Sequence, residues 1–365
     1  MRKVRVLLIA TNGLGKSGAP EVIMSIVRLL HNEYDFDVII TRNETYYKKE
    51  FESYGGKVYL LEEKMPKCRV ARVFYKLIGS QIKLRKSVKS ILKNNYGIIH
   101  SFKDLEGGTF LKVGRKQGIP IRISHCSRQY TKPKKISSQI YDKCLLKKIY
   151  KNATKLIAVS EASGLSLFGN KHDFQVLYNT YNEFYYDYKP IKKQESLVLT
   201  QIGTFLPLKN QLFSIKVFEQ ILKVISSAHL QLIGKKYDEK YFKEISEYIN
   251  AHNLEENIDI YDYDVNQKNI LEKTSFVLIP SLTEGLSLVA IESQASGIKC
   301  FASKGVPEEV SCGGIEFLDL KTNVWASEII NEYNRTKGKR TKNDMSKFSN
   351  ASFKNKLLEI YNDEN

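Results

Sequence analysis

Two carboxylates and a short run of backbone amides could together hold a phosphorylated sugar. Glu284 and Glu292 have seven residues between them, and Glu292 is the only charged residue in the run 286–296. The apolar run 276–280 predicts a buried strand, and the run 286–296 predicts a helix. The amides of residues 285–288 would then lie at the positive end of that helix, which suits a phosphate. Because carboxylates accept hydrogen bonds from hydroxyls, the segment suits a nucleotide sugar.

The same segment also fits an ordinary strand-and-helix unit. Glu292 would then lie on a solvated face, since burying a carboxylate without hydrogen-bond partners costs several kcal/mol. Taken alone, the residues of this segment leave both interpretations open.

The paired glutamates, Glu284 and Glu292, resemble those of glycosyltransferase family 4, and the resemblance runs along nearly the whole chain. It is nearest to the branch that makes bacterial capsular polysaccharide and exopolysaccharide. These are retaining enzymes with the α/β GT-B fold, in which two Rossmann-like domains face each other across a cleft and a C-terminal helix crosses back to the first domain. The resemblance implies that Glu284 orients the donor sugar and that Glu292 binds the ribose hydroxyls. It also implies that the donor phosphates meet Gly285, Leu286, Ser287 and Leu288.

The length of 365 residues predicts two domains, and strand and helix patterns alternate throughout, as in α/β proteins with parallel sheets. The polar, proline-containing stretch 187–196 is the expected linker. We therefore expect an acceptor-binding domain over 1–186, a nucleotide-sugar-binding domain over 187–347 and a returning C-terminal helix within 348–365. The expected strands are 4–11, 36–41, 57–61, 97–102, 119–125, 155–160, 175–178, 197–203, 229–234, 258–261, 276–280 and 299–302.

Positive charge is concentrated in the first half of the chain. Residues 1–183 hold 34 Lys and Arg against 15 Asp and Glu, a net charge of +19, whereas residues 184–365 hold 23 against 25, a net charge of −2. The densest basic runs are 64–93 and 132–155. Each Lys or Arg near an anionic membrane contributes about 1 kcal/mol to the free energy of binding. The basic runs therefore predict binding to an anionic membrane surface. Such charge would attract nucleic acid too, but no nucleic-acid-binding motif accompanies it, so none is expected as a partner.

The location predicted from composition is cytoplasmic and peripheral, on the inner face of the plasma membrane. No run of about 18 apolar residues exists, so no membrane span is expected. Five scattered cysteines without paired spacing fit a reducing cytoplasm and predict no structural metal.

A glycine loop follows the first expected strand. Gly13, Gly15 and Gly18 have the G-x-G-x-x-G spacing of dinucleotide-binding proteins. Such proteins carry an acidic residue at the end of the second strand, where it binds the ribose. Here that strand ends in Thr41, and no carboxylate follows until Glu44. The hypothesis of a nucleotide-dependent oxidoreductase is therefore weakened. By resemblance, Gly15 and Gly18 instead contact substrates in the first domain.

His125 ends an expected strand at its carboxyl edge, where ligands of open α/β sheets bind. A lone histidine is also common in protein cores. By resemblance, His125 matches the family's histidine beside the donor sugar, whereas His100 is expected only to pack or cap nearby.

Residues 202–210 predict a strand, a glycine turn and the start of a helix. By resemblance, Gly203, Thr204 and Asn210 line the donor site, and Lys209 meets the phosphates as a point charge. By the same resemblance, relatives usually carry arginine at the position of Thr204. Because of that difference, an alternative function stays open: the chain could be a catalytically weak or inactive partner subunit of another glycosyltransferase.

The run Asp262, Tyr263, Asp264 has the D-x-D spacing that binds metal in a different glycosyltransferase fold. Because it follows the expected strand 258–261, we expect the loop, with Tyr263, to border the nucleobase. No metal is predicted.

The resemblance implies retaining transfer of a hexose from a nucleotide sugar, a UDP-sugar, to a polyprenyl-pyrophosphate-linked glycan in bacterial surface polysaccharide synthesis. No cofactor is expected apart from this donor substrate. The residues expected to act in catalysis are His125, Lys209, Glu284 and Glu292. Fixed donors that face the departing diphosphate supply the largest usual catalytic effect.

Overall fold

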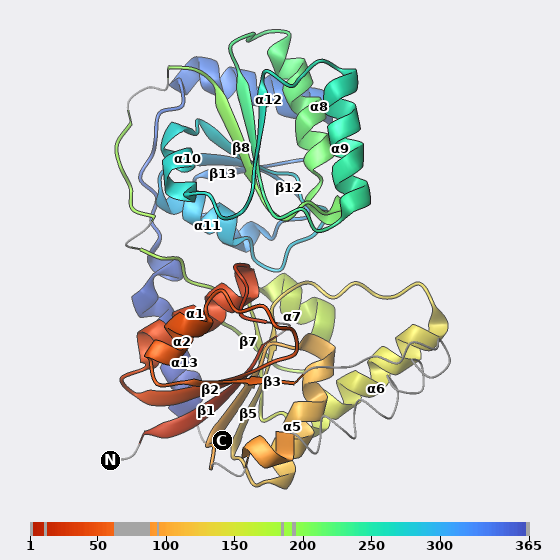
Figure 1. Cartoon of the computed structure of the whole chain (residues 1–365), viewed down its shortest axis with the longest axis vertical. Helices are drawn as coiled ribbons and strands as arrows, with labels where there is room; N and C mark the ends of the chain where they lie inside the picture. Colours follow the sequence, from red (N-terminus) through yellow and green to blue (C-terminus); the bar gives the residue numbers. More distant parts are fainter. Residues whose placement is uncertain are drawn as a thin grey trace. The chain divides into compact units, whose positions relative to one another are not determined.

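The computed structural model describes residues 3–10, 13–61, 88–92, 95–183, 186–191 and 195–362. The chain divides into two compact units, each built on one sheet (Figure 1). Unit 1 comprises Met1–Thr180 and Ala351–Asn365, and unit 2 comprises Tyr181–Asn350. These limits lie a few residues from the expected ones, after residues 186 and 347.

Unit 1 contains a seven-stranded sheet in the order β3-β2-β1-β4-β5-β6-β7, in which every pair is parallel. The order reverses between β1 and β4, and such a switch point leaves a crevice at the carboxyl ends of the strands. The strands are β1 (Val4–Ile9), β2 (Tyr34–Ile40), β3 (Lys57–Leu60), β4 (Ile98–Ser101), β5 (Ile121–Cys126), β6 (Lys155–Ala158) and β7 (Gln175–Val176). The helices are α1 (Gly18–Leu30), α2 (Lys48–Ser53), η3 (Asp104–Glu106), α5 (Gly107–Lys116), α6 (Ile136–Asn152), α7 (Glu161–Phe168) and α13 (Asn350–Asn362).

Helices cover both faces of this sheet, because alternate residues of a strand point to opposite sides. Leu8 of β1 packs in one cluster with Ile23 of α1 and Leu357 of α13. Its neighbour Ile9 belongs to a second cluster that includes Phe110 of α5. Burial on both faces explains why the strands read as nearly continuous apolar runs.

Unit 2 contains a six-stranded parallel sheet in the order β10-β9-β8-β11-β12-β13, with its switch point between β8 and β11. The strands are β8 (Val198–Ile202), β9 (His229–Ile233), β10 (Ile258–Tyr261), β11 (Phe276–Ile279), β12 (Lys299–Ser303) and β13 (Ile315–Leu318). The helices are η4 (Pro207–Lys209), α8 (Gln211–Leu222), α9 (Glu239–Ala251), α10 (Gln267–Lys273), α11 (Leu288–Ala295), η5 (Glu308–Val310), α12 (Thr322–Thr336) and η6 (Ser346–Phe348).

The expected α/β architecture of two parallel sheets is confirmed, and all twelve expected strands are present. The sequence analysis missed β13, which is the edge strand of the second sheet. This strand is short and only half-buried, and its Glu316 pairs with Lys299 at 2.7 Å. An edge strand with a carboxylate lacks the apolar pattern of a central strand, so periodicity did not reveal it.

Helix α13 returns the end of the chain to unit 1, as expected. Its buried face presents Phe353, Leu357, Ile360 and Tyr361 to the core of that unit. Tyr34 Oη donates a 2.8 Å hydrogen bond to Asn362 at the end of the helix. A buried leucine or isoleucine contributes about 1.5–3 kcal/mol, so this helix is an integral part of unit 1.

Replacing Leu357 with alanine should therefore lower the free energy of unfolding of unit 1 by about 2–5 kcal/mol, since it leaves a cavity in the core. Urea unfolding followed by circular dichroism measures the change. Asn355→Ala is the matched control, because this nearby side chain is exposed and its loss should cost no more than about 0.5 kcal/mol. Equal effects of the two substitutions would contradict the packing of α13 on unit 1.

Candidate functional site

Lys209 and Glu284 lie together at the carboxyl end of the unit 2 sheet. Lys209 Nζ forms an ion pair with Glu284 Oε1 and donates a hydrogen bond to it. Ser281 Oγ donates to the same carboxylate oxygen at 2.7 Å. The side chains of Lys209 and Glu284 are only 28% and 12% exposed. Two of the expected catalytic residues are thus in direct contact, and Ser281 is a partner that the sequence analysis missed.

The loop that carries Lys209 is held by side-chain amides. Asn210 adopts the left-handed conformation, with φ of 55°, directly before α8 begins, and asparagine tolerates this region better than most residues. Gln211 donates at 3.1 Å to the carbonyls of both Gly203 and Thr204. Gln201 donates at 2.6 Å to the carbonyl of Lys209. The two glutamines, which were not predicted, therefore fix the turn that places Lys209 beside Glu284.

Helix α11 begins at Leu288, two residues later than expected, because Ser287 is its N-cap. Ser287 Oγ accepts a 3.3 Å hydrogen bond from the amide of Ala290, so one of the amides at this helix end is already bonded. Leu286 and Ser287 are buried beside it. Glu292 lies further along the helix and is half-buried.

The D-x-D run forms a tight turn after β10. Asp262 Oδ1 accepts a 2.6 Å hydrogen bond from the amide of Tyr263, and both aspartates are exposed. Within the described part of the chain, no three His, Cys, Asp or Glu side chains are grouped so as to hold a metal ion.

In unit 1, the glycine loop is packed against the segment that follows β2. The amide of Leu14 donates to the carbonyl of Glu44 at 2.7 Å, and the amide of Tyr47 donates to the carbonyl of Leu14 at 2.9 Å. A Cβ atom on Gly13 would lie 2.6 Å from Glu44 Cβ, and one on Gly15 would lie 2.8 Å from Glu44 Oε2. These two glycines therefore permit a close approach of two chain segments, and the carboxylate of Glu44 beside them disfavours a second anion there.

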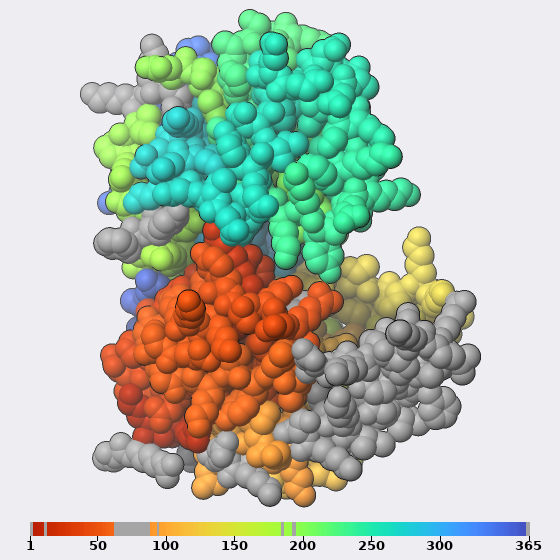
Figure 2. Space-filling model, in the orientation of Figure 1, coloured from red at the N-terminus to blue at the C-terminus, as the bar shows by residue number. Residues whose placement is uncertain are grey.

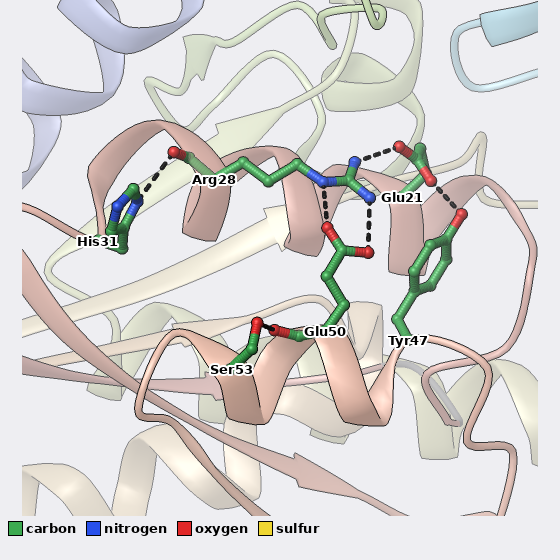
Figure 3. Close-up of polar contacts among 6 residues, drawn as sticks. All are labelled: Glu21, Arg28, His31, Tyr47, Glu50 and Ser53. Carbon is green, nitrogen blue, oxygen red and sulfur yellow. Dashed lines mark hydrogen bonds and ion pairs between the residues drawn. The ribbon is translucent and has the colours of Figure 1, made fainter.

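A cluster of charged side chains links helices α1 and α2 beside the glycine loop (Figure 3). Arg28 of α1 donates to Glu21 at 2.6 Å and to Glu50 of α2 at 2.7 and 3.0 Å. The phenol of Tyr47 donates a hydrogen bond to the carboxylate of Glu21. Burial alone would lower the pKa of Arg28, but Glu50 and Glu21 outweigh it and raise the pKa. The third glycine of the loop, Gly18, is the first residue of α1.

His125 is the penultimate residue of β5 and is completely buried. Its Nδ1 lies 3.0 Å from Nε2 of His100, at the end of the neighbouring strand β4, and the two rings are stacked. Nδ1 of His100 lies 2.8 Å from the phenol oxygen of Tyr361 in α13. Burial disfavours the charged imidazolium and lowers the pKa of His125 to about 3 and that of His100 well below its usual range. His100 and Tyr361 thus join His125, although the sequence analysis gave neither of them a functional role.

Asp104 is a second buried titratable group at this edge of unit 1, and the sequence analysis missed it. Its backbone has φ of 41°, a conformation that is rare for residues other than glycine. The carboxylate accepts bonds from Arg128 Nε at 2.9 Å and from the amide of Ser127 at 3.3 Å. Burial raises the pKa of Asp104 in spite of Arg128. This carboxylate therefore fixes the chain that leaves β5 just after His125.

Residues 186–313 match the family model described as Glycosyl transferases group 1, which covers most of unit 2 and the Lys209–Glu284 pair. This chain is a glycosyltransferase with a group 1 domain. The capsular polysaccharide biosynthesis glycosyltransferase CapH of Staphylococcus aureus is 26% identical over 370 residues, which cover 95% of this chain and 96% of CapH.

Two further proteins place this glycosyltransferase among others of similar architecture. The UDP-Gal:alpha-D-GlcNAc-diphosphoundecaprenol alpha-1,3-galactosyltransferase of Escherichia coli is 24% identical over 314 residues, 79% of this chain and 76% of that protein. The crystal structure of Anabaena HepE in complex with UDP and glucose superposes with a TM-score of 0.79 at 13% identity and covers 99% of this chain and 100% of that one. The latter likeness concerns the fold, and it confirms the expected GT-B class.

The buried histidine pair predicts a pH dependence of stability. The pKa of His125 is about 3 in the folded state and about 6.5 in an unfolded chain, so between these values only the unfolded chain binds the proton. The free energy of unfolding should therefore fall as the pH falls from 6.5 toward 3, by about 1.4 kcal/mol per pH unit for each such proton. Denaturation at a series of pH values measures this slope.

His125→Gln should reduce that slope by about 1.4 kcal/mol per pH unit, the contribution of one proton, because glutamine does not titrate. If His125→Gln keeps the slope of the native protein, His125 is not the buried neutral base described above.

Proposed function

We propose that this glycosyltransferase transfers a hexose, with retention of configuration, from a UDP-sugar to a polyprenyl-pyrophosphate-linked glycan in bacterial surface polysaccharide synthesis. The observation that carries the proposal is the contact between Lys209 and Glu284 at the carboxyl edge of the unit 2 sheet. CapH is named for capsular polysaccharide biosynthesis, and the name of the E. coli relative gives UDP-galactose as donor and a diphosphoundecaprenol-linked acceptor. The name of the E. coli relative supports this class of donor and acceptor here, and the name of CapH supports a role in surface polysaccharide synthesis.

The Lys209–Glu284 pair suggests how the donor engages. Without a ligand, the carboxylate of Glu284 neutralises the ammonium group of Lys209 in a largely buried setting. When the diphosphate arrives, Lys209 turns its charge toward the phosphate oxygens and frees Glu284 to accept a hydrogen bond from a hydroxyl group of the sugar. Glu292 holds the ribose hydroxyls, and the amides at the start of α11 and of Gly285 face the diphosphate. His125 contributes a contact to the sugar.

The proposed reaction balances without a metal or a redox cofactor. The bond between the anomeric carbon and the diphosphate oxygen breaks, and the acceptor hydroxyl oxygen forms the new bond on the same face of the sugar. The hydroxyl proton leaves with the diphosphate. Lys209 and the helix amides stabilise the negative charge that develops on the leaving group.

Helix α6 is the proposed membrane-facing element. It exposes Lys143, Lys147 and Lys151, and it also exposes Ile136 to 74% and Ile140 to 59%. In Figure 2 the yellow atoms of this stretch lie at the molecular surface. Basic and apolar side chains together suit an anionic interface. The other expected basic run, 64–93, lies almost entirely outside the described residues, and among those described no helix combines the length and apolar composition needed to cross a bilayer.

A UDP-sugar should stabilise the protein, whereas NAD should not. At a hundredfold excess over Kd, binding adds about 2.7 kcal/mol to the free energy of unfolding, which thermal denaturation detects. Glu292→Gln should weaken UDP binding by about 1–3 kcal/mol, the cost of a lost charge-assisted hydrogen bond. The matched control is Glu308→Gln, which changes an exposed glutamate of the same unit.

Transfer activity should survive treatment with EDTA, because the proposed reaction needs no metal.

Unchanged UDP affinity in Glu292→Gln would remove this residue from the site. If EDTA abolishes transfer and Mn²⁺ restores it, Asp262 and Asp264 become metal ligands. A protein that transfers nothing from any UDP-sugar, yet copurifies with another glycosyltransferase, would favour the partner-subunit function that Thr204 leaves open.

Vesicles that contain anionic lipid should bind the protein, and neutral vesicles much less. High salt should release it, because the Debye length shrinks from about 10 Å at 0.1 M to about 3 Å at 1 M. Replacing Lys143, Lys147 and Lys151 with glutamine should reduce cosedimentation with vesicles and leave UDP binding intact. The control replaces the exposed Lys240 and Lys243 of α9. Equal binding to both vesicle types would refute an electrostatic attachment.

A further inference from the structure

Three side chains from distant parts of the sequence form one hydrogen-bonded chain in unit 1. It runs from the phenol of Tyr361 to Nδ1 of His100, at 2.8 Å, and from Nε2 of His100 to Nδ1 of His125, at 3.0 Å. All three residues are at most 2% exposed. Nε2 of His125 is buried at the far end of this chain and has no hydrogen-bond partner among the described residues.

The direction of the protons along this chain follows from the number of donors. A neutral imidazole has one N–H donor and one bare nitrogen acceptor. Burial keeps His100 and His125 neutral, since it lowers the pKa of both, and it raises the pKa of Tyr361, so the phenol keeps its proton. Each of the two hydrogen bonds therefore has one defined donor.

The phenol of Tyr361 decides between the two possible directions. Among the described residues, its oxygen has a single hydrogen-bond partner, Nδ1 of His100. If His100 donated to the phenol oxygen, both the phenol O–H and the bare Nε2 of His125 would be buried without a partner among the described residues. The reverse direction leaves only the N–H of His125 without one, and unsatisfied buried polar groups are rare. Tyr361 therefore donates to His100, His100 donates from Nε2 to Nδ1 of His125, and the proton of His125 is on Nε2.

We propose that Tyr361, acting through His100, is a positioning residue that fixes His125 as an Nε2–H donor to a hydroxyl oxygen of a bound sugar. The ligand class rests on the proposed function, whereas the tautomer rests on the contacts alone. His125 lies at the carboxyl end of β5, the edge where parallel sheets bind ligands, and its buried N–H lacks a protein acceptor. A sugar hydroxyl supplies the acceptor that a neutral N–H needs.

The test is the ring-nitrogen NMR spectrum of the full-length protein labelled with ¹⁵N-histidine, because protonated and bare imidazole nitrogens differ widely in ¹⁵N shift. His125→Gln assigns the signals. In the native protein, Nε2 of His125 should be protonated and Nδ1 bare. Tyr361→Phe removes only the phenol oxygen and should give a mixture of the two tautomers. A proton on Nδ1 of His125 in the native protein, or an unchanged tautomer in Tyr361→Phe, would overturn the inference.

Tyr34→Phe is the matched control, because Tyr34 bonds Asn362 of the same helix and packs edge-on against the ring of Tyr361. It removes one phenol from the same contact region but should leave both histidine tautomers unchanged. If Tyr34→Phe mixes the tautomers as Tyr361→Phe does, loosened packing explains the effect and the positioning role is wrong.

The sugar contact has its own measurement. A UDP-sugar that stabilises the protein should shift the Nε2 signal of His125, and no shift under those conditions would refute the ligand assignment. Tyr361→Phe should lower kcat/KM on the order of tenfold, as expected for one neutral hydrogen bond. Absence of transfer from every UDP-sugar would refute the proposed function while the tautomer measurement still stands, so the two failures can be told apart.

Discussion

Parallel pairing of every strand is the constraint on which the rest of this protein depends. Because all strands of a sheet run in one direction, their carboxyl ends lie along one edge, and side chains from distant sequence positions meet there. In unit 2 this edge gathers Lys209, Ser281 and Glu284. In unit 1 it gathers His100 and His125. The same pairing requires helical crossovers, which cover both faces and demand apolar strands.

The Lys209–Glu284 contact has an energetic consequence for the proposed donor site. A largely buried ammonium group is costly to leave without a counterion, so a carboxylate beside it stabilises the empty site. A diphosphate can replace that carboxylate as the counterion, since its oxygens suit a compact cation. The carboxylate of Glu284 is then available to a sugar hydroxyl. Two charges that look like a structural ion pair can thus serve a glycosyltransferase as an exchangeable one.

The glycine loop shows that one spacing can serve different purposes. In dinucleotide-binding proteins the glycines let the backbone approach a pyrophosphate. Here Gly13 and Gly15 let the loop approach the segment around Glu44, and the carboxylate of Glu44 occupies the space beside Gly15. Glu44, the first acidic residue after the second strand, therefore lies against the glycines, in the place where a pyrophosphate would have to bind. This arrangement argues against the oxidoreductase alternative on physical grounds.

The sequence by itself determined most of the local elements, because periodicity and glycine turns are read along the chain, and it predicted Glu284 and Glu292 as site residues from their type and spacing. It missed β13 and placed the start of α11 two residues early, since an edge strand lacks the apolar pattern and Ser287 caps the helix. Only the tertiary structure decided that Tyr361 reaches His100 and that Glu44 reaches Gly15. Hydrophobic periodicity reports which residues are buried, but strand order and helix docking decide which buried polar groups meet.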